Sequence, residues 1–124
     1  MSTRIILVED IPALQTSLAV AMENAADVEV VAVVDTAEAA IEAASSQAWD
    51  VMVLDLFLRT GTGLAVLPAL RRVSTQRVLV LTNYATPNIR HQCYVLGADA
   101  VFDKAAELDD FLACLSPRIG AGAG

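Results

Sequence analysis

The side chains best suited to chemistry stand where short apolar runs of the sequence end. They are two adjacent acids, a third acid, a hydroxyl and a lysine: Glu9, Asp10, Asp55, Thr82 and Lys104. Carboxylates brought within a few Å repel one another, by about 4 kcal/mol for a pair about 4 Å apart in an effective dielectric of about 20. A hard divalent cation relieves this repulsion, and an all-oxygen site with positions open for water and phosphate suits Mg²⁺.

Such a site could support phosphoryl transfer. With the metal in place, one carboxylate can act as a nucleophile on a phosphoryl donor and form an acyl phosphate. Lys104 and the Thr82 hydroxyl are groups that would hold its oxygens. The other interpretation is that residues at strand ends only cap the next helix, as the acids Asp10 and Asp35 and the hydroxyl of Thr36 could do. The coincidence of an acid pair, a third acid, a hydroxyl and the only lysine favours the site.

The elements that must position these groups are five short strands. Runs rich in Val, Ile and Leu recur at a near-constant interval, at 5–8, 28–34, 51–54, 78–81 and 100–102. They mostly do not alternate with polar residues, which is typical of strands covered on both faces. Segments with helical spacing lie between them, and Thr86, Pro87 and Gly97 bound one of these helices. The alternation predicts a parallel, doubly wound α/β sheet.

This topology would gather the acids. If the sheet has the order 2-1-3-4-5, strands one and three are neighbours at the switch point, where ligands bind beyond the carboxyl ends of the strands. Glu9, Asp10 and Asp55 would then converge.

One predicted helix contains a proline. Its apolar positions are Val66, Ala69, Leu70 and Val73. Pro68 is tolerated there if the helix begins near Leu64, because proline is accepted in the first turn. The only basic cluster, Arg71, Arg72 and Arg77, is interpreted as a solvated helix end.

Composition excludes several classes of function. The chain has 124 residues, of which 56% are hydrophobic, and its 15 acids against 8 bases give a net charge of −7. We therefore expect one compact domain that contacts neither nucleic acid nor an anionic membrane. No apolar run is long enough to span a bilayer, and the N-terminus does not resemble a signal peptide. Two cysteines are too few for a disulfide framework, so we expect a cytoplasmic protein.

The pattern resembles the receiver domain of two-component response regulators, from Ile5 to Leu115. The matching stretches are Ile-Leu-Val-Glu9-Asp10, Val-Leu-Asp55-Leu with Gly63 eight residues later, Val-Leu-Thr82, and Gly97-Ala-Asp-Ala-Val-Phe-Asp-Lys104. The resemblance implies a single doubly wound (βα)5 flavodoxin-like domain, with a receiver domain over 1–117 and a flexible tail over 118–124. The sequence shows no output domain, so the chain is either a stand-alone receiver or part of a longer regulator.

The resemblance also implies roles for the acids. Asp55 would be the phosphoacceptor, in a Mg²⁺-dependent reaction. Asp10 and Asp55 would bind the metal through their side chains, and the backbone carbonyl of Phe57 would be a third protein ligand. Glu9 would act on the metal mainly through water.

Further implied roles concern switching and partners. Thr82 would be a hydroxyl that moves toward the phosphoryl group, and Lys104 would pair with a phosphoryl oxygen. The phosphate would come from a sensor histidine kinase or a phosphotransfer protein. The phosphorylated domain would present an altered surface, mainly helix four, strand five and helix five, to an unknown downstream protein target. A homodimer is compatible with this role.

Three positions depart from the family's usual pattern. Family members usually carry an aromatic residue three positions before the lysine, where this chain has Val101; strand alternation would point Phe102 to the other face. A proline with a cis bond often follows the lysine, but Ala105 favours a trans bond, because a non-proline cis bond costs about 2.5–4 kcal/mol. Arg59 stands where proline is often found, with little expected effect.

Two bulky residues, Phe57 and Tyr84, follow Asp55 and Thr82 by two positions. We expect them to restrict the attacking water and slow the loss of phosphate. The other interpretation is that they only cover the rim of the site.

Two other classes of function are weighed against the phosphorylated receiver. The first is a receiver-like interaction module that signals without phosphorylation. Val101 favours it, whereas the intact Asp55, Thr82 and Lys104 oppose it. The second is a flavin- or nucleotide-binding protein, which would need a loop rich in Gly, Ser or Thr where Glu9 and Asp10 stand. A haloacid-type hydrolase would need a second aspartate at position 57, which is Phe57.

Overall fold

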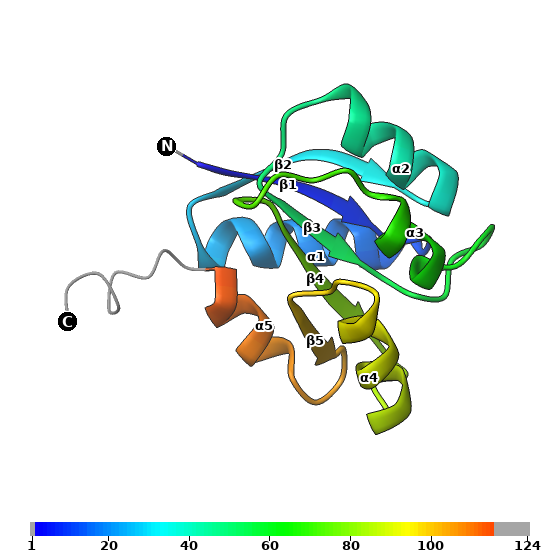
Figure 1. Cartoon of the computed structure of the whole chain (residues 1–124). Helices are drawn as coiled ribbons and strands as arrows, with labels where there is room; N and C mark the ends of the chain where they lie inside the picture. Colours follow the sequence, from blue (N-terminus) through cyan, green and yellow to red (C-terminus); the bar gives the residue numbers. More distant parts are fainter. Residues whose placement is uncertain (1, 116–124) are drawn as a thin grey trace.

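The computed structural model describes residues 2–115, in which five strands alternate with five helices (Figure 1). The predicted tail, 118–124, lies outside the described residues. The strands are β1 (Thr3–Val8), β2 (Val28–Val34), β3 (Val51–Leu54), β4 (Arg77–Thr82) and β5 (Ala100–Asp103). The helices are α1 (Pro12–Ala25), α2 (Ala37–Ser46), α3 (Gly63–Ala69), α4 (Pro87–Val95) and α5 (Leu108–Leu115).

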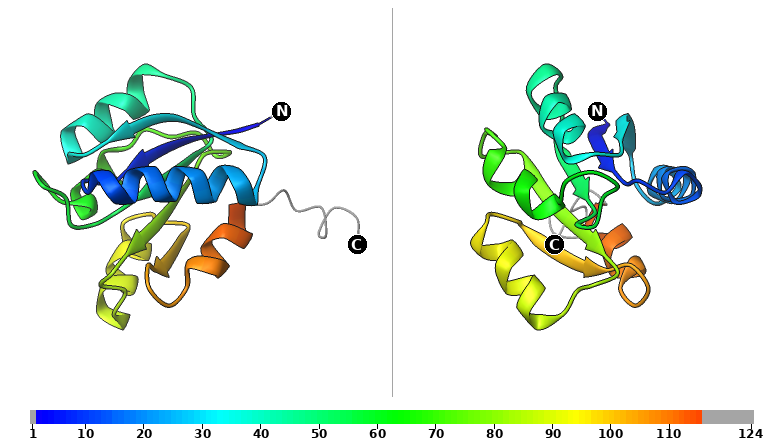
Figure 2. Two further views of the ribbon diagram at one scale, coloured as in Figure 1. Left: turned by 180° about the vertical axis from the view of Figure 1, so that it is seen from behind. Right: turned by 90° about the vertical axis from the view of Figure 1, so that its right-hand side faces the viewer.

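The strands form one parallel sheet of order β2-β1-β3-β4-β5, which confirms the prediction. Helices α1 and α5 cover one face of the sheet, and α2, α3 and α4 cover the other (Figures 1 and 2). Among residues 2–115, no helix is both long and apolar enough to cross a membrane.

Two apolar clusters, one on each face of the sheet, form the core. Successive side chains of a strand point to opposite faces, so Ile5 and Leu7 join one cluster while Ile6 and Val8 join the other. All four are at most 1% exposed, which explains why these strands lack polar alternation. Phe111 of α5 is fully buried, and burying one such side chain contributes about 1.5–3 kcal/mol.

Helix α3 is shorter than the sequence pattern predicts. It ends at Ala69 rather than near Val73, and Pro68 lies in its last turn rather than its first. Proline lacks an amide hydrogen and its ring clashes with the carbonyl four residues earlier, here that of Leu64, which destabilises the helix at this point; it ends one residue later. Leu70 has extended backbone angles.

Arg72 consequently does not lie at a helix end, contrary to the sequence interpretation. Its guanidinium contacts the Asp99 carboxylate at 2.6 Å and also donates to the Gly97 carbonyl. Asp99 accepts the Val78 amide as well, at 2.7 Å. Arg72 therefore joins the segment after α3 to the segment that enters β5.

Asp50, just before β3, ties the starts of two strands together. Its carboxylate accepts the Arg4 amide at 2.8 Å and pairs with the Arg4 guanidinium at 3.1 Å. These side-chain and backbone hydrogen bonds from Arg4 hold the pKa of Asp50 below its ordinary 3.8. Such a carboxylate stabilises the fold fully above its unfolded pKa, and the stabilisation is lost as the pH falls through the folded value.

We expect Asp50→Asn to lower the thermal midpoint by about 2 °C at pH 7, because the pair is partly exposed. The deficit should shrink as the pH is lowered well below 3.8, because the native carboxylate then becomes protonated as well. Thermal unfolding followed by circular dichroism at pH 7 and at the lower pH measures this. A deficit that grows in acid would contradict the assignment.

Candidate functional site

The strand ends bring the predicted site residues to one edge of the sheet. Val8 pairs with Leu54 across β1 and β3, so Glu9 and Asp55 follow on adjacent strands. The Asp55 amide donates to the Val8 carbonyl at 3.1 Å, which continues the strand ladder into the site. On the other side, the Lys104 amide donates to the Thr82 carbonyl at 2.9 Å.

Three carboxylates converge there, as predicted. One oxygen each from Glu9, Asp10 and Asp55 can be chosen so that all lie within 4.8 Å of one another. Glu9 is 1% and Asp55 7% exposed, and Asp10 is half-buried. At such separations two ionised carboxylates repel by about 3 kcal/mol in an effective dielectric of about 20. The donor set is all oxygen, which suits a hard divalent cation.

Lys104 joins this cluster. Its Nζ lies 2.6 Å from Glu9 Oε1 and 3.0 Å from Asp55 Oδ2, and its side chain is 10% exposed. Burial alone would lower the pKa of Lys104, but hydrogen bonds and charges from Glu9 and Asp55 outweigh it and the pKa is raised. One ammonium does not balance three ionised carboxylates, so the site keeps an excess of negative charge.

Helix capping does not explain Asp10. The N-cap of α1 is Ile11, and no side-chain hydrogen bond caps that helix. The Ile11 amide instead donates to Glu9 Oε2 at 3.2 Å. Capping does explain Thr36, whose hydroxyl accepts the Ala39 amide at 3.1 Å. The capping interpretation therefore holds for Thr36 but fails at the acid pair and for Asp35, whose carboxylate pairs with an arginine side chain instead.

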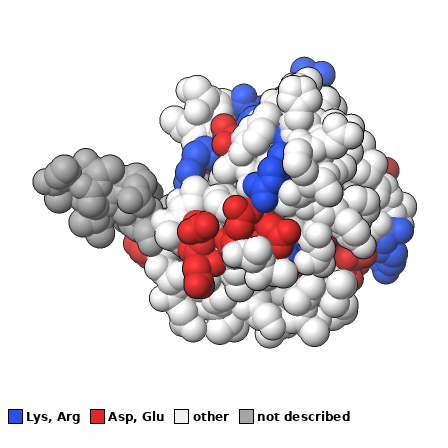
Figure 3. Space-filling view, turned by 90° about the horizontal axis from the view of Figure 1, so that it is seen from below, with Lys and Arg blue, Asp and Glu red and all other residues white. Residues whose placement is uncertain are grey.

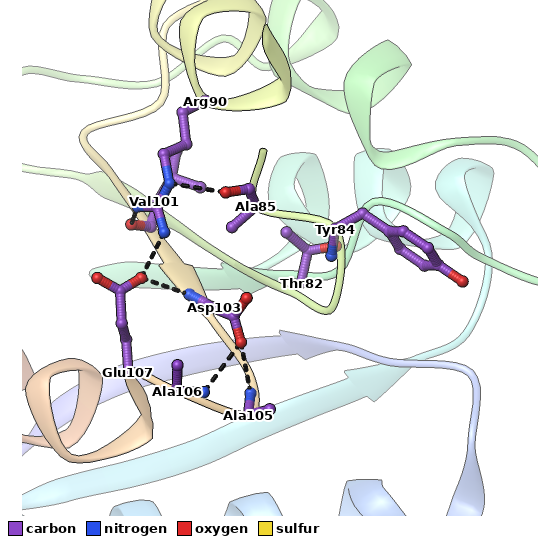
Figure 4. Close-up of polar contacts among 9 residues, drawn as sticks. All are labelled: Thr82, Tyr84, Ala85, Arg90, Val101, Asp103, Ala105, Ala106 and Glu107. Carbon is purple, nitrogen blue, oxygen red and sulfur yellow. Dashed lines mark hydrogen bonds and ion pairs between the residues drawn. The ribbon is translucent and has the colours of Figure 1, made fainter. Parts of the chain in front are cut away.

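Thr82 lies at the site edge but is bonded within its own loop. It is fully buried, and its Oγ1 accepts the Tyr84 amide at 3.2 Å (Figure 4). The hydroxyl thus closes a short turn and is not hydrogen bonded to the acids.

Phe57 and Tyr84 contact each other, which the sequence did not predict. Their ring centroids are 4.5 Å apart with an interplanar angle of 60°. Both remain about half exposed, at 51% and 57%. The Phe57 amide also approaches Asp55 Oδ1 at 3.4 Å. The aromatic pair (Phe57 and Tyr84) therefore joins the loop after Asp55 to the loop after Thr82.

Gly63 allows α3 to begin against the end of β3. A Cβ at this position would lie 2.8 Å from the Leu56 Cα and still closer to the Asp55 carbonyl oxygen. The Gly63 amide donates to the Leu56 carbonyl at 2.9 Å. A larger residue would push the backbone of Asp55 itself, which explains a glycine at this spacing.

Two positions near Lys104, Val101 and Ala105, depart from the usual family pattern, and the structure shows what each does. Val101 is 4% exposed and belongs to the core cluster under α2, α3 and α4. Phe102 faces the opposite side, as predicted, and its ring lies 5.8 Å from that of Phe111. No cis peptide bond occurs within residues 2–115, so the bond before Ala105 is trans.

Sequence reasoning missed two polar residues near the site. Gln15 donates through Nε2 to the Glu9 carbonyl at 2.6 Å. Arg90, on α4, contacts the carboxylate of Glu107, just before α5, at 2.6 Å. The Gln15 contact is with the segment directly before its own helix, whereas Arg90 contacts a residue 17 positions away, so only the second depends on how a helix packs against a distant segment.

Comparison with known proteins identifies one family and many solved structures with a similar fold. A family model described as "Response regulator receiver domain" matches residues 5–116. No match was found among the curated proteins.

Three solved structures illustrate the similarity. The BeF3-activated N-terminal receiver domain of RstA from Klebsiella pneumoniae is 25% identical, with 91% of this chain and 95% of that chain covered and a TM-score of 0.81. The signal receiver domain of NarL from Mycobacterium tuberculosis is 25% identical, with 92% and 96% covered and a TM-score of 0.78. A CheY-like receiver domain protein from Methanospirillum hungatei is 22% identical, with 93% and 91% covered and a TM-score of 0.80. These similarities agree with the predicted flavodoxin-like fold.

Proposed function

This chain belongs to the response regulator receiver domain family, and from that premise we propose that Asp55 accepts a phosphoryl group in two-component signalling. The observation that supports this role is the convergence of Asp55 with Glu9, Asp10 and Lys104 at one sheet edge. A carboxylate oxygen of Asp55 attacks the phosphorus of a phosphohistidine, the new O–P bond forms as the P–N bond breaks, and the imidazole keeps the electron pair. The donor is a sensor histidine kinase or a phosphotransfer protein.

Magnesium fits the acid cluster. Asp10 and Asp55 would hold Mg²⁺ through their side chains, with the Phe57 carbonyl as a further ligand and Glu9 acting through water. The all-oxygen donors and the excess negative charge support this assignment. When bound, the ion would offset the charge of both the carboxylates and the incoming phosphoryl group.

Lys104 and Thr82 would then serve the phosphorylated state. The Lys104 ammonium, which now contacts Asp55 Oδ2, is close enough to pair with an oxygen of a phosphoryl group on Asp55. The Thr82 hydroxyl would exchange its bond with the Tyr84 amide for one with the phosphoryl group. That exchange would move the loop between β4 and α4.

Intact-mass analysis after incubation with acetyl phosphate tests the proposal. We expect a mass gain of one phosphate with Mg²⁺ and none with a chelator. An interaction module that signals without phosphorylation is the alternative, favoured by the small buried residue at Val101. Absence of both phosphate gain and any response to beryllofluoride with Mg²⁺ would support that alternative.

The aromatic pair is expected to prolong the phosphorylated state. Replacing both Phe57 and Tyr84 with serine should speed the loss of phosphate about tenfold, which corresponds to about 1.4 kcal/mol of barrier. The reason is that their rings contact one another beside Asp55 and would restrict the attacking water. Phosphate release timed after removal of the donor measures this.

Tyr94→Ser is the matched control, because Tyr94 is an equally exposed aromatic residue on α4. It should leave the rate unchanged. An unchanged or slower rate in the double variant would leave only the second interpretation, in which the rings cover the rim.

The downstream partner is a protein that reads the surface of α4, β5 and α5. We also propose that a homodimer can form in response to phosphorylation. Size-exclusion chromatography with and without beryllofluoride tests the dimer.

A further inference from the structure

Helix α4 is weakly anchored by apolar contacts. Its only buried residue is Cys93, whereas Tyr94 and Val95 are 50% and 69% exposed. Apolar burial is the main stabilising term for most surface helices, so little of it is available here. The position of α4 on the sheet must depend strongly on its polar contacts.

Arg90 supplies these contacts from the middle of α4. Its Nε donates to the Ala85 carbonyl at 2.9 Å and its Nη1 to the Val101 carbonyl at 3.0 Å. Its Nη2 contacts Glu107 Oε1 at 2.6 Å. Figure 4 shows the guanidinium between the β4–α4 loop, strand β5 and the segment before α5.

Glu107 extends the link to the loop that carries Lys104. The same oxygen, Oε1, accepts the Asp103 amide at 2.8 Å, and the Glu107 amide donates to the Asp103 carbonyl at 2.9 Å. Asp103 Oδ1 accepts the amides of Ala105 and Ala106 at 2.8 and 2.9 Å. The segment from Asp103 to Glu107 is therefore one hydrogen-bonded unit with Lys104 inside it.

This arrangement joins two segments that border the site. Ala85 lies in the loop that follows Thr82 and leads to α4 (residues 83–86, the Thr82 loop), and Asp103 precedes Lys104 directly. Arg90 and Glu107 are each about one-third exposed, so their pair is only partly screened by solvent. Figure 3, viewed from the side of α4, β5 and α5, shows acidic and basic side chains in contact on this surface.

We propose that Arg90 is a positioning residue that couples the Thr82 loop to the start of α5 and stabilises the unphosphorylated arrangement. This inference rests on the proposed function, in which Thr82 moves toward a phosphoryl group. Movement of the Thr82 loop displaces the Ala85 carbonyl from Arg90 and so loosens the hold of Arg90 on Glu107. The α4–β5–α5 surface then changes without an aromatic side chain at position 101.

The coupling has a thermodynamic consequence. A contact made only in the unphosphorylated state lowers the population of the switched state, and weakening it raises the apparent affinity for any group that binds the switched state. Arginine makes the three contacts through a rigid planar fork, which lysine cannot reproduce. Arg90→Lys and Glu107→Gln should both weaken the link from opposite ends.

The test titrates beryllofluoride with Mg²⁺ into the unaltered chain, Arg90→Lys, Glu107→Gln and Arg72→Lys. The matched control is Arg72, which also joins one carboxylate to a backbone carbonyl but lies by the segment that enters β5. We expect both test variants to bind about fivefold or more tightly, the lower end of typical coupling between sites. Hydrogen exchange at 104–112 without beryllofluoride should also be faster in both, and Arg72→Lys should change neither quantity.

Thermal unfolding of each variant separates coupling from simple loss of stability. Unchanged or weaker beryllofluoride binding in both folded test variants, while the unaltered chain responds, would overturn the role of Arg90 and leave the proposed function standing. Absence of any response in the unaltered chain would overturn the proposed function, and this inference with it.

Discussion

Asp55→Asn is expected to abolish the gain of phosphate from acetyl phosphate and Mg²⁺. An amide oxygen carries no full negative charge and is a poor nucleophile toward phosphorus. The substitution also removes the charge of one of the two carboxylates, Asp10 and Asp55, proposed to hold the metal directly. Intact-mass spectrometry should therefore show one added phosphate in the unaltered chain and none in the variant.

Asp50→Asn is the matched control for this experiment. Asp50 precedes β3, whereas Asp55 follows it, so the two aspartates lie at opposite ends of the same strand. The control variant should gain phosphate like the unaltered chain. Equal phosphate gain in Asp55→Asn would show that another side chain is the acceptor, and the proposed chemistry would be wrong.

We expect Lys104→Met to lower the free energy of unfolding, measured without metal, more than the other single substitutions do. It leaves buried Glu9 and nearly buried Asp55 without the cation that contacts both. Removing one partner of a buried ion pair typically costs about 3–5 kcal/mol, because the remaining charge is uncompensated. Urea unfolding in a chelator measures the loss, and Mg²⁺ should restore part of it in the variant.

The double variant Lys104→Met with Glu9→Gln tests whether uncompensated negative charge causes this loss of stability. Glutamine has nearly the shape of glutamate but no charge, so it removes part of the uncompensated repulsion. We expect the double variant to be more stable in chelator than Lys104→Met alone. A loss below about 1 kcal/mol in Lys104→Met, with no response to Mg²⁺, would contradict the account of this site as strongly anionic.

Much of the site could be predicted because it depends on strand ends. The runs before Glu9, Asp55 and Lys104 are apolar at nearly every position, which identifies buried parallel strands without any knowledge of contacts. Once the strands are parallel and ordered β2-β1-β3-β4-β5, their carboxyl ends share one edge, and the residues that follow must meet there. The orientation of Val101, which replaces the family's usual aromatic residue, could also be predicted, because strand alternation alone places Phe102 on the opposite face.

Local periodicity was less reliable where a backbone constraint competed with it. Helical spacing continues from Val66 to Val73, yet α3 contains Pro68 and ends one residue later, at Ala69. The apolar pattern describes which residues could share a face, but a missing amide hydrogen and a ring clash decide whether the backbone can continue.

The sequence by itself determined the alternation of strands and helices and placed Glu9, Asp10, Asp55 and Lys104 at or just beyond strand ends, because side-chain period is local and repetitive; their gathering also needed the strand order that the family resemblance implied. Only the tertiary structure decided the contact of Phe57 with Tyr84 and the link from Arg90 to Glu107. Those contacts join residues 27 and 17 positions apart through long or rotatable side chains. Their partners depend on how each loop and helix packs on the sheet, which no local pattern encodes.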